Sequence, residues 1–111
     1  MEAQAIARYV RISPRKANRV MALIRGKSID EARAILKFSP GKAPKFVEKV
    51  LNSAVANAVN NFELSEDDLY VARAYANKGP VLKRFRIGTQ GRVNPVKKYT
   101  SHLYIILEEK E

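Results

Sequence analysis

Apolar residues in the first half of the chain recur at the three- and four-residue spacing of amphipathic helices. The first stretch lies within 13–26, where Ser13 followed by proline suits a helix start and Gly26 suits its end. The second stretch, 28–38, begins with serine and glutamate at capping-box spacing. The third, 39–61, carries many alanines, which suit close packing against a neighbouring element. The pattern therefore predicts three helices.

Three other segments have the composition of β-strands. The segment 3–12 alternates small, polar and branched residues, and 69–76 and 102–109 are rich in Tyr, Val and Ile. We therefore predict an α+β fold, a single domain 1–111 in which three helices pack on a small antiparallel three-stranded sheet. A long basic β-hairpin, 79–97, is expected to protrude from it.

Two of the helix starts share a short sequence. SPRKA at 13–17 and SPGKA at 39–43 look like a repeat, but their flanks diverge and Pro44 shifts the second helix start. Shared helix-start chemistry is a better explanation than duplication of a segment.

The charge of the chain is concentrated in its last third. Lys and Arg number 21 against 11 Asp and Glu, which gives a net charge of +10. Between Asp68 and Glu108 there is no carboxylate, while the rest of the chain is nearly balanced. Such concentrated positive charge indicates a polyanionic partner, nucleic acid or anionic lipid. The basic residues in this interval are Arg73, Lys78, Lys83, Arg84, Arg86, Arg92, Lys97 and Lys98.

The basic segment is predicted to form a two-stranded ribbon, because a long structureless loop is unusual in a compact domain. Antiparallel pairing of 69–78 with 98–107 puts the turn at GTQG, 88–91, and Pro80 roughly opposite Val96. Ten residues per strand give a reach of about 30 Å. A ribbon of this kind is marginally stable alone in water and would be held by phosphates.

The ribbon also carries aromatic residues among its cations. Phe85 and Tyr99 are able to stack on bases or to anchor the base of the ribbon. The alternative is a flexible, solvated loop, but such a loop would more often mix charges of both signs. Contact with nucleic acid is therefore favoured.

Several segments together resemble one family of ribosomal proteins. VRISPRKANRVMALIRGKSIDEARAILKF at 10–38, KVLNSAVANAVNN at 49–61, AYANKGPVLKRFR at 74–86 and KKYTSHLYIIL at 97–107 are similar to the large-subunit ribosomal protein family number twenty-two, bacterial type. The resemblance covers nearly the whole chain in the same order. Each motif alone is weak, but the combination is specific.

The resemblance implies a fold, partners and a location. It implies an α+β body on the outer face of the large subunit, bound to large-subunit ribosomal RNA beside neighbouring ribosomal proteins, as a monomer in the cytoplasm. It also implies a role in subunit assembly and a hairpin that lines the exit tunnel, where its tip meets the nascent polypeptide. No cofactor, metal, membrane or DNA partner is implied.

The resemblance, together with the charge pattern, assigns roles to individual residues. The hairpin tip, Ile87, Gly88, Thr89, Gln90 and Gly91, is expected to line the tunnel, although relatives commonly have Pro-Arg-Ala after KRFR. Pro95 and Tyr99 are also atypical. The residues expected to bind rRNA are Arg11, Ser13, Pro14, Arg15, Lys16, Arg19, Lys78, Lys83, Arg84, Arg86, Arg92, Lys97, Lys98, Thr100, Ser101 and His102.

Three features resemble catalytic or metal sites, but none has the residues or the geometry that such a site requires. GKS at 26–28 lacks the first glycine of a phosphate-binding loop, since Met21 stands in its place. Ser101 and His102 are neighbours on a predicted strand and point to opposite faces, so they cannot form a nucleophile–base pair. We expect His102 to donate a hydrogen bond at a strand edge.

The acidic cluster Glu66, Asp67 and Asp68 is expected to be solvated, and cysteine is absent. No enzyme is predicted.

Some alternatives stay open at the level of sequence. Asn52, Asn57, Asn60 and Asn61 either read RNA or cap and solvate the third helix. A sequence-indifferent nucleic-acid-compacting protein is the alternative function, although DNA-wrapping arms usually work in symmetric dimers. A small RNA-processing enzyme would need a histidine or carboxylate cluster near the basic surface, which 69–107 does not supply.

Overall fold

The fold is an antiparallel sheet with helices on one of its faces. The computed structural model describes the backbone of residues 2–87, 91 and 93–110, and the side chains of these residues except 82, 84–87 and 93–97. Its elements follow in the order β1 (Glu2–Val10), α1 (Pro14–Ile24), α2 (Ile29–Phe38), α3 (Ala43–Phe62), the 3-10 helix η1 (Glu66–Asp68), β2 (Leu69–Lys78), β3 (Leu82–Ile87), β4 (Val93–Lys98) and β5 (Ser101–Glu109).

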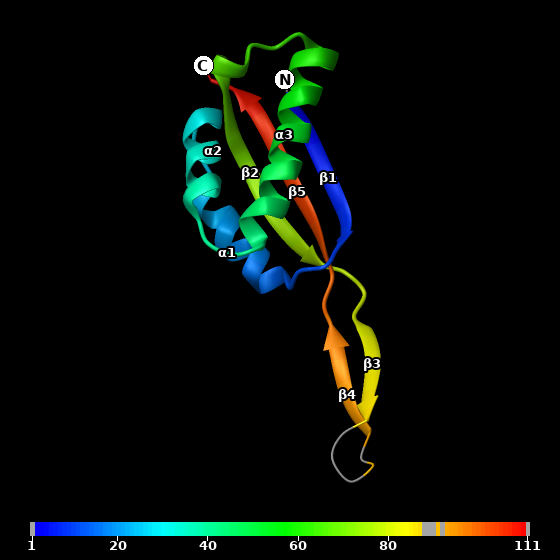
Figure 1. Ribbon diagram of the computed structural model, residues 1–111. Coiled ribbons are helices and arrows are strands. Elements are labelled where there is room, and N and C mark those ends of the chain that lie inside the picture. The colour runs from blue at the N-terminus through cyan, green and yellow to red at the C-terminus, as the bar shows by residue number, and fades with distance from the viewer. Residues whose placement is uncertain (1, 88–90, 92, 111) are drawn as a thin grey trace.

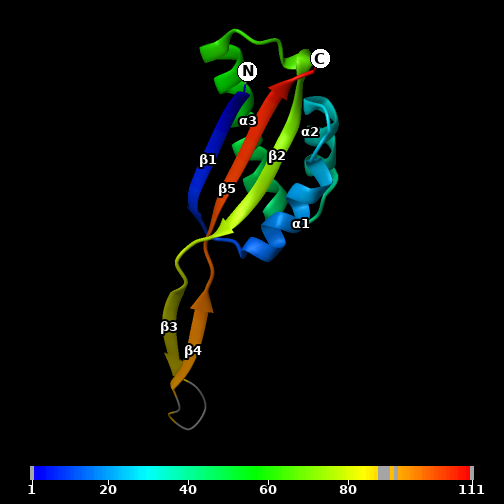
Figure 2. The same cartoon turned by 180° about the vertical axis from the view of Figure 1, so that it is seen from behind.

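The main sheet has the strand order β1-β5-β2, with β5 antiparallel to both neighbours. The three α-helices cover one face of this sheet (Figure 1). Seen from behind, the opposite face has no helix on it (Figure 2). The predicted α+β fold with three helices on a three-stranded antiparallel sheet is therefore confirmed.

The helices begin and bury residues as their sequences predict. Ser13 caps α1 by accepting the Lys16 amide at 3.3 Å, and Ser28 caps α2 by accepting the Glu31 amide at the same distance. The apolar stripes of the helices then pack against Leu103, Ile105 and Leu107 of β5, each fully buried. Burial of each such side chain stabilises the fold by about 1.5–3 kcal/mol.

The pairing of β2 with β5 differs from the prediction. Leu69 pairs with Glu109, two residues beyond the expected partner, and Lys78 pairs with Ser101. A register shift between Val71 and Arg73 inserts an extra residue into β2, which the simple symmetry of the sequence did not include.

The simple symmetry of the sequence implied uninterrupted pairing from the main sheet into the ribbon, but the structure has a break between the two. β3 and β4 form a separate antiparallel pair that runs from Leu82↔Lys98 to Ile87↔Val93. Pro80 lies before β3, and Val96 pairs with Arg84 instead. Of the predicted turn 88–91, only Gly91 lies within the described residues, and its φ of +77° suits a glycine.

A short segment, which we call the neck (79–81 and 99–100), connects the main sheet to β3 and β4. The Gly79 amide donates to the Thr100 carbonyl at 2.9 Å, and the Thr100 hydroxyl donates to the Pro80 carbonyl at 2.5 Å. A Cβ on Gly79 would lie only 2.6 Å from Thr100 Oγ1. Close approach of the two segments of the neck therefore requires glycine at this position.

Asparagine and arginine side chains from the helices bond to the outer edges of the sheet. Asn18 of α1 donates to the Ala76 carbonyl at 2.9 Å and accepts the Ala76 amide at 2.8 Å, and Arg25 Nε donates to the Ala74 carbonyl at 2.7 Å. On the other edge, Asn57 of α3 donates to the Gln4 carbonyl at 2.9 Å. These bonds satisfy backbone groups that would otherwise be open to pairing with another strand.

Candidate nucleic-acid interface

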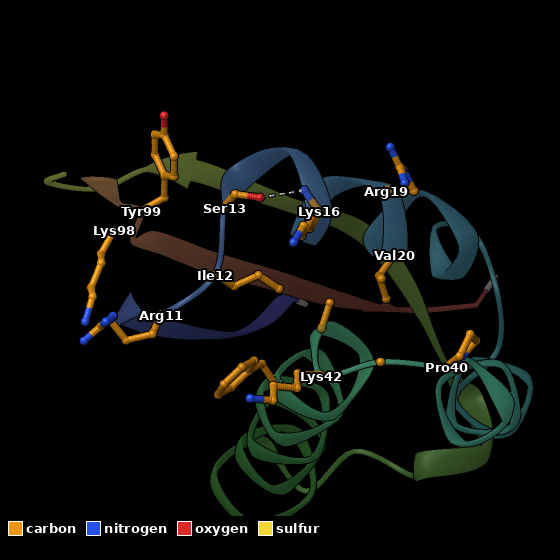
Figure 3. Close-up of a pocket in the computed structure, with 13 residues that line it drawn as sticks. Arg11, Ile12, Ser13, Lys16, Arg19, Val20, Pro40, Lys42, Lys98 and Tyr99 are labelled. Atoms are coloured by element: carbon orange, nitrogen blue, oxygen red, sulfur yellow. Dashed lines mark hydrogen bonds between the residues drawn. The ribbon is translucent and has the colours of Figure 1, made fainter. Parts of the chain in front are cut away.

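A groove of about 770 Å³ lies beside the neck. We call it the basic groove, because its lining includes five cations and no carboxylate. The cations are drawn from the β1–α1 link, α1, the α2–α3 link and the end of β4 (Figure 3). The groove is lined by Arg11, Ile12, Ser13, Lys16, Arg19, Val20, Pro40, Gly41, Lys42, Ala43, Phe46, Lys98 and Tyr99.

The groove has an apolar floor and cationic rims. Ile12 and Val20 are each 9% exposed and belong to the core, and Phe46 is half-buried and packs against it. The five cations of the rims are exposed. A ligand that combines an apolar or aromatic part with negative charge would match both surfaces.

The wall of the groove formed by the β1–α1 link is held by hydrogen bonds. The Ile12 amide donates to the Val10 carbonyl at 2.8 Å, and the Ile12 carbonyl accepts the buried Ser101 hydroxyl at 2.5 Å. Together with the Ser13 cap, these bonds fix the backbone that presents Arg11 and Lys16. Arg11 and Lys16 therefore project from backbone that hydrogen bonds hold in place.

The opposite wall comes from the start of α3. Lys42 is the N-cap residue of this helix, which has no side-chain cap and no acidic residue in its first turn. α1 likewise has no acidic residue in its first turn and begins next to Ser13 at the groove. The positive ends of both helix dipoles therefore add to the positive potential of the groove.

The cations of the groove have no carboxylate partners within the described part of the chain. Its two side-chain ion pairs join Arg33 to Glu66 and Arg73 to Glu2, and neither includes a groove residue. The side chains of Arg11 and Lys98 point toward one another (Figure 3), although both are positive. An anion placed between like charges would relieve their repulsion.

Several acidic side chains lie at the other end of the body. η1 and the outer ends of β1 and β5 lie opposite to β3 and β4 (Figure 1), and they carry Glu66, Glu2 and Glu108. A hydrogen bond with Glu2, the Tyr70 hydroxyl at 2.9 Å and the charge of Arg73 hold the pKa of Glu108 below its ordinary value. The molecule is therefore polarised along its length.

The structure brings five of the predicted rRNA-binding residues into this groove: Arg11, Ser13, Lys16, Arg19 and Lys98. Pro14 and Arg15 lie beside them at the start of α1 without lining it, and Lys78 at the end of β2 and Lys83 in β3 are exposed and do not line it either. The side chains of Arg84, Arg86, Lys97 and the tip Ile87, and all of Gly88, Thr89, Gln90 and Arg92, lie outside what the structure describes.

Thr100, Ser101 and His102 make contacts within the chain. Thr100 and Ser101 are buried with both hydroxyls donating to backbone carbonyls, and RNA contact by them stays a prediction. His102 was expected at a strand edge, but it lies on β5, the central strand of the sheet, and its Nδ1 accepts the Tyr9 amide at 3.1 Å. The reason is a bulge that turns Tyr9 to a φ of +58° and aims its amide at the ring. Donation of a hydrogen bond by His102 stays a prediction.

Sequence reasoning missed the wall of the groove formed by Pro40, Gly41 and Lys42. The available signal was the similarity of SPRKA and SPGKA, which was interpreted only as helix-start chemistry. The two copies lie on facing walls of the groove, so each places a lysine at its rim.

Two other sequence features can now be placed. Asn52 accepts a hydrogen bond from Arg33 at 3.1 Å, and Asn57 bonds to β1, so both serve the fold. Asn60 and Asn61 are exposed. In the acidic cluster, Glu66 is paired with Arg33 instead of solvated, and the described residues contain no group of side chains suited to a metal. Within the same residues, no helix is long and apolar enough to cross a bilayer.

Comparison with known proteins gives consistent matches over the full length of the chain. Residues 5–108 match the family described as Ribosomal protein L22p/L17e. The chain is 57% identical over 110 residues to the large ribosomal subunit protein uL22 of Thermus thermophilus, covering 99% of this chain and 97% of that protein. It is 56% identical over 110 residues to the protein of the same name from Clostridium novyi, covering 99% of each. For that of Carboxydothermus hydrogenoformans, identity is 54% over 111 residues, covering 100% of this chain and 98% of the other.

Proposed function

The chain belongs to the ribosomal protein L22p/L17e family, and we propose that it is a structural protein of the large ribosomal subunit that binds rRNA through the basic groove and the β3–β4 ribbon. The cytoplasmic location predicted from the sequence agrees with this membership. Its partners are rRNA and neighbouring proteins of the subunit.

The observation that carries this proposal is the separation of charge along the molecule. Five exposed cations without carboxylate partners among the described residues surround one groove at the neck. The ribbon next to it adds Lys83, Arg84, Arg86, Arg92 and Lys97 by sequence. RNA phosphates would neutralise both surfaces together, with release of condensed counterions.

The tip of the ribbon has a separate proposed role. We propose that the tip, residues 87–91, reaches the wall of the exit tunnel and contacts the nascent polypeptide. The support is the family membership and the direction in which β3 and β4 extend away from the body (Figure 2). A photoreactive residue placed at Gln90 should cross-link to a stalled nascent chain. Cross-links to rRNA alone would contradict the contact.

Sedimentation of the tagged chain tests the main proposal. Expressed in a bacterium depleted of its own family member, the chain should restore growth and sediment with large subunits, and treatment with ribonuclease should release it. The compacting alternative predicts sedimentation with chromosomal DNA and release by deoxyribonuclease. A chain that stays with free protein at the top of the gradient would overturn the proposal.

A further inference from the structure

The basic groove offers more than positive charge. Its floor is apolar, with Ile12 and Val20 each 9% exposed and Phe46 half-buried, and its lysines and arginines stand at the rims. A surface that bound only phosphates would gain nothing from an apolar floor, because the phosphate groups of a nucleic acid are charged and hydrated. The groove is therefore suited to a ligand with both an anionic and an apolar part.

An unpaired nucleotide has this combination of properties. In a duplex the bases are stacked in the interior, and only phosphates and riboses meet a protein rim. In a loop or bulge the base can turn outward and pack on apolar or aromatic side chains while the backbone follows a basic surface. The floor and the rims of the groove match these two parts.

We propose that the basic groove binds a single-stranded segment of rRNA, with one unpaired base against Ile12, Val20 and Phe46 and its flanking phosphates against Arg11, Lys16 and Lys42. This inference rests on the proposed function, which it deepens by naming the form of RNA. Two facing lysines, one from each SPxKA helix start, hold the backbone from both sides. Tyr99, 45% exposed, belongs to the neck and lines the groove beside Lys98.

An acidic polypeptide is the competing occupant, since it too is an anion. The floor argues against it, because a chain of Asp and Glu has no flat apolar group to place on Phe46. η1 and the outer ends of β1 and β5, which carry Glu66, Glu2 and Glu108, lie at the end of the body away from β3 and β4 (Figure 1), and none of these three residues lines the groove.

The test compares a short fluorescent oligouridine with a blunt duplex RNA of the same length, using the full chain and fluorescence anisotropy over a range of salt. The floor variant Phe46→Leu keeps the position apolar but removes the ring. It should weaken binding of the single strand about fivefold or more and leave duplex binding unchanged. Thermal unfolding of each variant verifies that it is folded.

A rim variant keeps the test decisive if the floor variant is unstable. Lys16→Gln with Lys42→Gln should lower the slope of log affinity on log salt for the single strand by about 1.4, at about 0.7 per phosphate contact. Its matched control is Lys45→Gln with Lys49→Gln, which removes the same charge from exposed positions of α3 outside the groove. The control should change the slope much less than the rim variant.

Several results would overturn the inference. One is a rim variant that behaves as its control does; another is equal loss of single-strand and duplex binding in Phe46→Leu. Tight binding of polyglutamate that depends on both rim and floor would assign the groove to an acidic polypeptide. If these results appear while the chain still sediments with large subunits, only the groove assignment fails. Loss of sedimentation as well would reject the proposed function.

Discussion

The Ser101 hydroxyl donates a hydrogen bond to the carbonyl of Ile12 at 2.5 Å, although the two residues are 89 positions apart. Ser101 is fully buried, and it is the first residue of β5 after the neck. Ile12 forms part of the floor of the basic groove. This one bond therefore ties the floor of the groove to the start of β5, the strand that follows the neck.

Ser101→Ala should destabilise the protein. The change leaves the Ile12 carbonyl without its partner in a buried place, which costs about 1–3 kcal/mol of the free energy of unfolding. Urea unfolding followed by circular dichroism measures the loss. Ser53→Ala, at an exposed position of α3, is the control and should change the free energy by less than about 0.5 kcal/mol. Equal effects of the two changes would show that the bond contributes nothing.

Gly79→Ala should also destabilise, for a steric reason. The new Cβ would meet Thr100 Oγ1 at 2.6 Å, so the neck must shift, at a cost of about 1–3 kcal/mol. Thr100→Ala removes that oxygen together with its bond to Pro80. In a double-mutant cycle the cost of Gly79→Ala should be smaller in the Thr100→Ala background. Strict additivity would mean that the contact with Oγ1 is not the source of strain.

The asparagine that bonds to the edge of β2 can be tested by amide exchange. Asn18→Ala removes the donor to the Ala76 carbonyl and the acceptor of its amide, so the Ala76 amide should exchange faster with solvent. Asn18→Asp keeps an acceptor for the amide and should preserve more of the protection. The expected loss of stability for Asn18→Ala is about 1–3 kcal/mol. Unchanged exchange at Ala76 in Asn18→Ala would contradict the assignment.

Acid should weaken the end of the sheet that carries Glu108. The hydrogen bond with Glu2, that from Tyr70 and the charge of Arg73 hold the folded-state pKa of Glu108 below its ordinary value of 4.5. A lowered folded pKa gives stability that is present above the unfolded value and is lost as pH falls through the folded value. The urea midpoint of the unchanged protein should therefore fall more than that of Glu108→Gln between neutral pH and pH values below 4.5. Parallel midpoints would contradict the shift.

The ribbon makes a prediction separate from that for the groove. Replacing Lys83, Arg84 and Arg86 together by glutamine should weaken RNA binding and lower the salt slope by about 2 to 3, at 0.7 to 0.9 per phosphate contact. Three exposed lysines outside the groove and ribbon, Lys37, Lys45 and Lys49, serve as the matched control. A slope that is unchanged in the ribbon variant would mean that these three side chains do not contact phosphate.

Local patterns in the sequence determined the elements and their order. Ser13 and Ser28 act as the N-caps that their positions predict, and the three helical stripes and the body strands lie where their periodicity placed them. These features are predictable because a cap or an amphipathic stripe depends on residues within one or two turns of the helix. The excess of positive charge in the last third is likewise a property of composition alone.

Only the tertiary structure decided how distant segments meet. The bulge between Val71 and Arg73 and the contact of Gly79 with Thr100 set the register and interrupt the ribbon. The groove joins Arg11, Lys42 and Lys98, which lie in three separate parts of the chain. No local pattern encodes such a meeting, because it depends on how the helices pack on the sheet and bring their first turns to a common edge. The sequence thus specified the charge and the elements, while packing decided which of the cations share one surface.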